Sequence, residues 1–293
     1  MKLLARGHTL EWPRAPLIMG IVNLSVDSFS GDGLGNVEAA LEKARGLVAD
    51  GAEIIDIGAE SARTNREAIA GEQEAAQLVR FIECWEAEAA ISNLKVQSLP
   101  LLSINTWRPA VARVALAAGG HILNDIGALP TDENAQICAE TGAALLIMHS
   151  VGAPKVAQTH VSYDDVMSSI EEFFAEKIAL AERAGISREA IILDPGIDFA
   201  KQRADNLRIY RELDRLARFA RPILLPVSRK TVIGDVLGLS NPADRDAGTV
   251  ACIVQGMLRG AAIFRVHNVR AAAQAVRMIT AVEGAAWEGA ETR

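Results

Sequence analysis

The chain has 293 residues, half of them hydrophobic, and 30 Lys and Arg against 37 Asp and Glu give a net charge of −7. This acidic balance argues against broad nucleic-acid binding, although it leaves room for a local basic site that binds a small anion. The sequence shows neither a signal-peptide core nor an apolar run long enough to span a membrane, so we expect a cytoplasmic protein. Without a CxxC pair, the three cysteines are expected to be reduced thiols.

The chain opens with two short mixed segments around Gly7 and His8, which predict a small hairpin over residues 1–12 that plugs one end of the fold. From Pro16 onward an apolar strand, a polar strand end, a loop and an amphipathic helix alternate regularly. Strands are expected at 17–22, 52–57, 101–104, 121–123, 144–148, 190–193, 223–227 and 262–264. Helices are expected at 37–49, from about 72 through the Cys84 region, and at 109–118, 134–140, 166–185, 206–218, 244–259 and 269–282, with a surface extension at 87–99 and a frayed tail after 284.

Eight strand–helix units predict a TIM (β/α)8 barrel, forming one domain over residues 1–293 with its core at about 16–283. A doubly wound open sheet is the alternative. In a barrel, the carboxyl ends of the strands carry the chemistry, and each of these ends has a polar residue. Any one of them alone is explained by capping, but their convergence on one rim predicts a functional site: Asn23, Glu60, Asn105, Asn124, His149, Asp194, Lys230, Arg265 and His267.

The stretch IILDPGIDF at 191–199 is the most informative of these strand ends. An uninterrupted apolar run ends at Asp194, and Pro195 and Gly196 then turn the chain away. A carboxylate at the end of a buried strand is costly unless something binds it, and the alternative is an ordinary cap. Its two oxygens suit two parallel N–H donors such as an aminopyrimidine edge, with Asn105 and Asn124 reading the other heteroatoms of a flat ring.

A basic group lies at the ends of the last two predicted strands, where barrels usually recognise phosphate. Lys230 follows the seventh strand, and Arg265 and His267 follow the eighth. Arg265 and His267, together with Asn23 and Ser25, would suit a polyphosphate that shares a hard cation such as Mg²⁺ with an amide oxygen. Taken singly, His267 is equally consistent with a buried structural histidine, and Lys230 with a solvated loop charge.

Two glycine-containing loops, at 25–35 and 58–71, have the length of mobile lids, although plain connectors are the alternative. The sequence contains no GxSxG, P-loop, HExxH or GxGxxG motif. A Schiff base on Lys230, with Arg229 lowering its pKa, would give an aldolase-type enzyme, but it leaves Asp194 and the two asparagines without a role.

Seven segments together resemble the dihydropteroate synthases of the pterin-binding barrel superfamily, and the resemblance extends from about residue 16 to 283. The segments are IMGIVNLSVDSFSGDG (18–33), GAEIIDIGAESAR (51–63), HILNDI (121–126), LIMH (146–149), ILDPGIDFAK (192–201), PVSRKTVIG (226–234) and FRVHNV (264–269).

The resemblance implies a transferase that joins 6-hydroxymethyl-7,8-dihydropterin diphosphate to 4-aminobenzoate, with Mg²⁺ as cofactor and a homodimeric assembly. Asn105, Lys230 and Arg265 would be catalytic. The implied pterin residues are Asn105, Asn124, Met148, Asp194, Lys230 and Arg265. The implied diphosphate residues are Asn23, which also holds the metal, Arg265 and His267, and the implied 4-aminobenzoate residues are Arg63, Phe199 and Thr231.

The chain departs from the family at several positions. Asn105 stands where an aspartate is usual, and losing that charge predicts a rate cost on the order of a hundredfold. With that carboxylate gone, Asp194 is expected to be the one charged group left to recognise the ring. A catalytically weak pterin-binding paralogue and a pterin-dependent methyltransferase are the alternatives, and altered sulfonamide sensitivity is a further expectation. The remaining departures are Val26, Ala62, Thr64, Asp198, whose role the sequence does not explain, and Asn268.

Overall fold

The computed structural model describes residues 1–24, 33–60, 68–91, 100–156 and 161–284. Within them, eight strands form one parallel sheet in the order β8-β7-β6-β5-β4-β3-β10-β9. Leu193 in β8 forms a parallel bridge with Ile223, next to β9, and thereby closes the sheet. The predicted barrel is therefore confirmed, and the open-sheet alternative is wrong. Its strands are β3 (Leu17–Asn23), β4 (Ile54–Gly58), β5 (Leu101–Asn105), β6 (Ile122–Asp125), β7 (Ala144–Met148), β8 (Ile191–Asp194), β9 (Leu224–Leu225) and β10 (Ile263–Val266).

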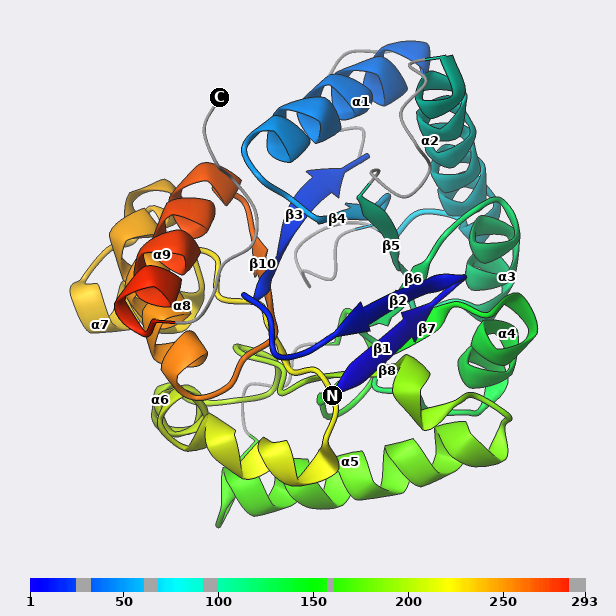
Figure 1. Cartoon of the computed structure of the whole chain (residues 1–293). Coiled ribbons are helices and arrows are strands. Elements are labelled where there is room, and N and C mark those ends of the chain that lie inside the picture. The colour runs from blue at the N-terminus through cyan, green and yellow to red at the C-terminus, as the bar shows by residue number, and fades with distance from the viewer. Residues whose placement is uncertain (25–32, 61–67, 92–99, 157–160, 285–293) are drawn as a thin grey trace.

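The helices surround the strands on the outside (Figure 1). They pack on the outward side chains of the strands, in a cluster that contains the fully buried Phe81, Phe174 and Phe264. The helices are α1 (Gly33–Ala49), α2 (Gly71–Ile91), α3 (Pro109–Ala117), α4 (Glu133–Thr141), α5 (Val166–Arg183), α6 (Arg203–Glu212), α7 (Thr231–Leu237), α8 (Asp246–Leu258) and α9 (Val269–Val282), with 3-10 turns η3 (Arg188–Ala190), η4 (Leu213–Phe219) and η5 (Pro242–Arg245).

Several predicted boundaries were wrong. Helix α6 starts at Arg203, because a capping box between Gln202 and Asp205 fixes its first turn, and η4 replaces its predicted last turns. The strand predicted at 223–227 is only β9, since Pro226 has no N–H for the ladder. Helix α7 was not predicted; its seven residues are too few to show a clear helical period. Helix α2 continues to Ile91, into the predicted surface extension.

The amino end of the barrel is filled with apolar side chains and closed by a hairpin. Strands β1 (Lys2–Ala5) and β2 (His8–Glu11) pair antiparallel, and lie in front of the barrel strands in Figure 1. Leu3 and Ala5 are fully buried. They pack in one cluster with the inward residues of the strands, which include Leu17, Met19, Ile54, Leu101, Ile122, Ala144, Leu146, Ile192 and Ile263. The predicted hairpin plug is confirmed.

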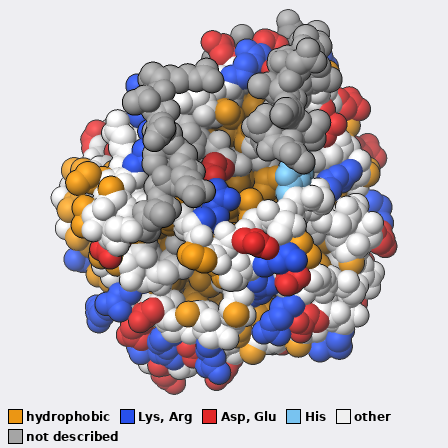
Figure 2. Space-filling view, in the orientation of Figure 1, with side chains coloured by type: hydrophobic (Ala, Val, Ile, Leu, Met, Phe, Trp, Pro, Cys, Tyr) orange, Lys and Arg blue, Asp and Glu red, His pale blue; other side chains and the backbone are white. Residues whose placement is uncertain are grey.

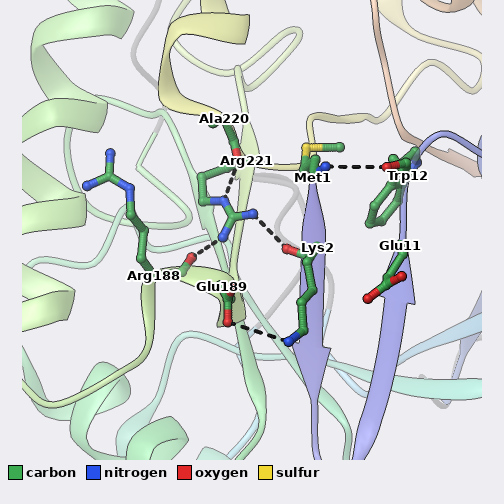
Figure 3. A pocket seen from close by; sticks show the side chains of 8 residues that line it. All are labelled: Met1, Lys2, Glu11, Trp12, Arg188, Glu189, Ala220 and Arg221. Atoms are coloured by element: carbon green, nitrogen blue, oxygen red, sulfur yellow. Dashed lines mark hydrogen bonds and ion pairs between the residues drawn. The ribbon is translucent and has the colours of Figure 1, made fainter.

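Arg221 fastens this hairpin to the barrel. Its guanidinium donates to the carbonyl oxygens of Lys2 at 2.6 Å, Arg188 at 2.6 Å and Ala220 at 2.8 Å (Figure 3). A hollow of about 450 Å³ lies between the hairpin and these segments. It is at the amino end of the barrel, where the fold class does not place chemistry, so it is not the candidate active site.

None of the described helices combines the length and the apolar character that crossing a membrane requires. On the face shown in Figure 2, acidic and basic side chains are interspersed, so no large field of one sign covers it.

Candidate active site

Asp56, in the middle of β4, is the centre of a polar network inside the carboxyl end of the barrel. Asp56 is 1% exposed. It accepts hydrogen bonds from Ser103 Oγ at 2.6 Å, Arg265 Nε at 2.7 Å, Asn124 Nδ2 at 3.1 Å and Asn105 Nδ2 at 3.4 Å. These donors come from β5, β6 and β10. Four strands are thus joined through one buried carboxylate.

The alternation of side chains along parallel strands explains this convergence. In β4, Ile54 points into the barrel and Ile55 points to the helices, so Asp56 points inward again. Register then places Asp56 beside Ser103, and Asn105 beside Asn124. The sequence prediction missed Asp56, although an aspartate that interrupts the run IIDI is itself a signal of a paired buried charge.

Asp194 was predicted to be the one charged group left to recognise a ring, and the structure places a second buried carboxylate, Asp56, in the same end of the barrel. Asp194 ends β8 and is 4% exposed. Its Oδ1 accepts the Gly196 N–H at 2.7 Å, and Met148 is its neighbour in register on β7. Burial raises the pKa of Asp194 to about 6, and the Gly196 hydrogen bond and the positive charge of Lys230 partly oppose this rise.

Near Asp194, the predicted rim residue His149 pairs with Lys201, which the sequence prediction did not assign. Lys201 Nζ is 2.9 Å from His149 Nδ1 and donates to the carbonyl oxygens of Phe199 at 3.0 Å and His149 at 3.3 Å. Burial lowers the pKa of Lys201 to about 7 and that of His149 to about 3. The predicted rim residue His149 is therefore a neutral imidazole that positions Lys201.

Lys230 lies directly before α7, as its N-cap residue. Its Nζ donates to the carbonyl oxygen of Ile197 at 2.8 Å and lies 5.0 Å from the centre of the Phe199 ring. The neighbouring Arg229 is turned away, because its Nε is 2.7 Å from Asp246 Oδ1. The Schiff-base alternative required Arg229 to act on Lys230, and the structure instead pairs the Arg229 charge with a carboxylate.

The three predicted anion-binding residues lie at neighbouring strand ends but make different contacts. Arg265 points inward from β10 to Asp56. His267 lies one residue beyond β10, and its Nδ1 is 2.8 Å from Ser228 Oγ. Asn23 is exposed at the end of β3, opposite Gly58 in register. Because the strand ends at Val266, strand alternation does not fix the direction of the His267 side chain.

Phe199 and Thr231, predicted for the amine substrate, are brought together by the residue whose role the sequence did not explain. Asp198 Oδ2 accepts the Thr231 N–H, and its Oδ1 accepts the Val232 N–H at 3.3 Å. The other unusual residue near this end, Asn268, caps α9 through the Ala271 N–H. Arg63, Val26, Ala62 and Thr64 lie outside the described residues.

The predicted rim residue Glu60 belongs to a separate ion-pair cluster. Its carboxylate contacts Arg108 and lies 2.7 Å from Lys155 Nζ, while Arg108 also contacts Glu74. Arg108 also donates to the carbonyl oxygen of Ile69 at 3.3 Å. The cluster therefore joins the segments that follow β4, β5 and β7.

Among the described residues, no three His, Cys, Asp or Glu side chains gather in a way that could hold a metal ion. Asn23 offers one exposed amide oxygen, which suits a hard cation that takes its other ligands from phosphate and water.

A barrel with a buried carboxylate network at its carboxyl end, basic side chains beside it and amide groups in register is the architecture of a pterin-binding enzyme. A family model described as "Pterin binding enzyme" matches residues 19–267. The chain belongs to this family and, within it, to the dihydropteroate synthases.

The relatives are similar along almost the whole chain. The dihydropteroate synthase of Escherichia coli strain K12 is 36% identical over 282 residues, which are 96% of each chain. That of Synechocystis is 36% identical and covers 94% of this chain and 93% of its own. A structure of the Xanthomonas albilineans dihydropteroate synthase with 4-aminobenzoic acid has 35% identity and a TM-score of 0.85, covering 98% of this chain and 100% of its own.

Proposed function

We infer that the chain joins 6-hydroxymethyl-7,8-dihydropterin diphosphate to 4-aminobenzoate and releases pyrophosphate, as a dihydropteroate synthase of folate biosynthesis. The observation that carries this conclusion is the set of inward polar side chains from four strands around Asp56. The sequence resemblance is confirmed by relatives that match end to end, including a structure of a dihydropteroate synthase with 7,8-dihydropteroate at a TM-score of 0.83.

The pterin ring is proposed to bind inside the carboxyl end of the barrel. Asp194 accepts the paired N–H groups of its aminopyrimidine edge. Asn124 and Asn105, fixed by their hydrogen bonds to Asp56, present amide groups to the remaining heteroatoms. Met148 supplies an apolar contact, and Arg265 and Lys230 close the site from the last two strands.

The diphosphate is proposed to bind Arg265, His267 and Asn23. Asn23 would hold a Mg²⁺ ion through its amide oxygen, and the ion would supply positive charge that offsets the charge of the diphosphate. The contact with Ser228 Oγ orients the His267 ring at the end of the last strand. The Asp56 carboxylate fixes the guanidinium of Arg265 in the same way.

The amine substrate is proposed to bind beside Phe199, Thr231 and Arg63. The bond between the pterin methylene carbon and the diphosphate oxygen breaks first, and its electron pair leaves with the diphosphate. The buried Asp56 and Asp194 carboxylates stabilise the positive charge that develops on the ring, while Arg265 and His267 stabilise the leaving anion. The amine nitrogen then forms the new C–N bond and loses a proton to solvent, and Lys230 and Phe199 orient the reactants for this step.

The chain is proposed to act as one unit over residues 1–293, in the cytoplasm and as a homodimer. Exposed hydrophobic side chains support a dimer through the last helices: among the described residues, Val236, Leu237, Leu258, Met278 and Val282 on α7, α8 and α9 are each at least 46% exposed. Figure 2 shows hydrophobic side chains gathered on the side of the molecule formed by these helices. Analytical ultracentrifugation tests this assembly; a monomer at all concentrations contradicts it.

The activity is tested by measuring pyrophosphate release from purified protein. We expect release that requires the pterin diphosphate, 4-aminobenzoate and Mg²⁺ together. Because Asn105 replaces the usual aspartate, a weak pterin-binding paralogue is the second candidate, and tight pterin binding by calorimetry without turnover would establish it. The relatives are synthases, which supports this activity over the methyltransferase alternative.

A further inference from the structure

Asp198 lies in the turn after β8, between the two halves of the proposed amine-binding region. Its backbone φ is +68°, a left-handed conformation that favours glycine. Aspartate adopts this conformation more readily than most residues with a side chain, but it remains uncommon there. Such a costly residue requires an explanation from its contacts.

The carboxylate is held on two sides. Its Oδ2 and Oδ1 accept the N–H groups of Thr231 and Val232, at the start of α7. Asn206 Nδ2 donates to Oδ1 at 3.2 Å, and the Asp198 N–H donates to Asn206 Oδ1 at 2.9 Å. Because Asn206 is only 2% exposed and also donates to Gln202, the position of the carboxylate is fixed by the fold.

These contacts hold the Asp198 carboxylate in the region in which the amine would bind. Phe199 is the next residue in the chain, and Thr231 is a direct partner. The two lysines nearby make other contacts: Lys230 donates to Ile197, and Lys201 to His149 and Phe199. The Asp198 carboxylate therefore lies beside Thr231, and the Thr231 and Val232 N–H groups already have an acceptor.

We propose that Asp198 is a specificity-determining residue that disfavours a carboxylate on the amine substrate relative to a neutral group of the same shape. Two anions at close range repel, and the backbone donors that would compensate a second carboxylate are taken by the first. The wild-type chain is thus expected to favour 4-aminobenzoate over neutral para-substituted arylamines less strongly than a variant without the Asp198 charge. This inference rests on the proposed function.

The test compares two amine substrates of nearly equal shape, 4-aminobenzoate and its neutral amide, 4-aminobenzamide. Pyrophosphate release gives kcat/KM for each with the wild-type chain, with Asp198→Asn, which keeps a side-chain oxygen for Thr231, and with Asp198→Gly, which suits the positive φ. We expect the benzoate-to-benzamide ratio of kcat/KM to rise about tenfold in both variants, because repulsion acts only on the charged substrate. Asp198→Gly keeps the test available if Asp198→Asn folds poorly.

Asp165→Asn is the matched control. Asp165 also caps a helix through two backbone N–H groups, those of Met167 and Ser168, but its ion-pair partners are Arg208 and Arg215, which lie outside the proposed site. In the Asp165→Asn variant, the benzoate-to-benzamide ratio of kcat/KM is expected to stay unchanged. An unchanged ratio in active Asp198 variants overturns the specificity assignment and leaves the proposed function standing. A wild-type chain that uses neither amine contradicts the proposed function itself, and this inference with it.

Discussion

The two ends of the barrel are built from the same strands and differ in almost every other respect. At the amino end, inward side chains such as Leu17 and Ile263 are apolar, and Leu3 of the hairpin seals them. At the carboxyl end, the inward positions two to four residues later in the same strands carry Asp56, Arg265 and other polar groups. The amino end is closed by hydrophobic packing, and the carboxyl end is held by charge and hydrogen bonds.

This difference teaches how the barrel separates stability from chemistry. Apolar packing needs only size and shape, so the amino end tolerates a hairpin from outside the strand–helix repeat. The carboxyl end needs each polar atom to have its partner, because an unpaired buried carboxylate would be costly. Changes at the two ends should therefore affect different measurements, and the following predictions test that separation from the largest effect on activity to the smallest.

Replacing Asp56 with Asn should have the largest effect on kcat/KM among the variants that still bind pterin. The Arg265 guanidinium would lose its charged acceptor, and the Asn105 and Asn124 amides would lose their shared orientation. We expect kcat/KM for pyrophosphate release to fall on the order of a thousandfold. The control is Asp125→Asn, a buried aspartate that faces outward to Asn134 and should lose less than about tenfold. Equal losses would show that burial alone, and not the inward network, matters.

Replacing Asp194 with Asn or Ala should abolish pterin binding measurable by calorimetry. The Asn amide presents a donor where the ring also presents one, and Ala presents no acceptor. Binding that survives either change would refute the assignment of Asp194 to the aminopyrimidine edge.

The affinity of the wild-type chain for pterin should depend on pH through Asp194. Its pKa in the folded protein is raised to about 6, so the carboxylate that accepts the ring N–H groups is lost as pH falls through 6. We expect the association constant to fall about tenfold per pH unit below that value. The same raised pKa means that the folded state holds this proton more tightly than the unfolded state, so the contribution of Asp194 to the free energy of unfolding decreases as pH rises from about 4 to 6. A flat binding profile would contradict the prediction.

Replacing Asn105 with Asp should raise kcat moderately, by about tenfold. The sequence argument predicts a hundredfold cost for the lost charge, but in the structure Asn105 Nδ2 lies 3.4 Å from Asp56 Oδ2, so a new carboxylate would face an existing one. Stopped-flow or steady-state pyrophosphate release measures the gain. A full hundredfold gain would mean that Asp56 does not oppose it, and no gain would mean that Asp56 already supplies the charge.

Replacing Leu3 with Ala should lower stability while leaving activity within about twofold. Leu3 is fully buried in the amino end, and removing its side chain should cost about 2–5 kcal/mol of the free energy of unfolding, measured by denaturant titration. Leu4→Ala, on the less buried face of the same strand, is the control and should cost less. A large loss of kcat/KM in well-folded Leu3→Ala protein would show that the two ends are coupled.

The sequence determined the strand–helix repeat, and with it the barrel, the hairpin and the polar strand ends. These features are local, because apolar runs, turn residues and helical periods are written in consecutive residues. The errors arose where tertiary contacts decided the outcome, as in β9, which Pro226 shortens, and in α7, whose start is fixed by Asp198 from another segment.

Only the tertiary structure decided which polar residues meet. Asp56 was hidden inside an apolar run, and its partners lie 47 to 209 residues away in sequence, so no local pattern could pair them. Lys201 and His149, 52 residues apart, form a contact that neither strand end predicted. The sequence therefore specified that polar groups stand at strand ends. The closure of the sheet decided which of them form hydrogen bonds or ion pairs, because only closure brings distant strands to a common axis.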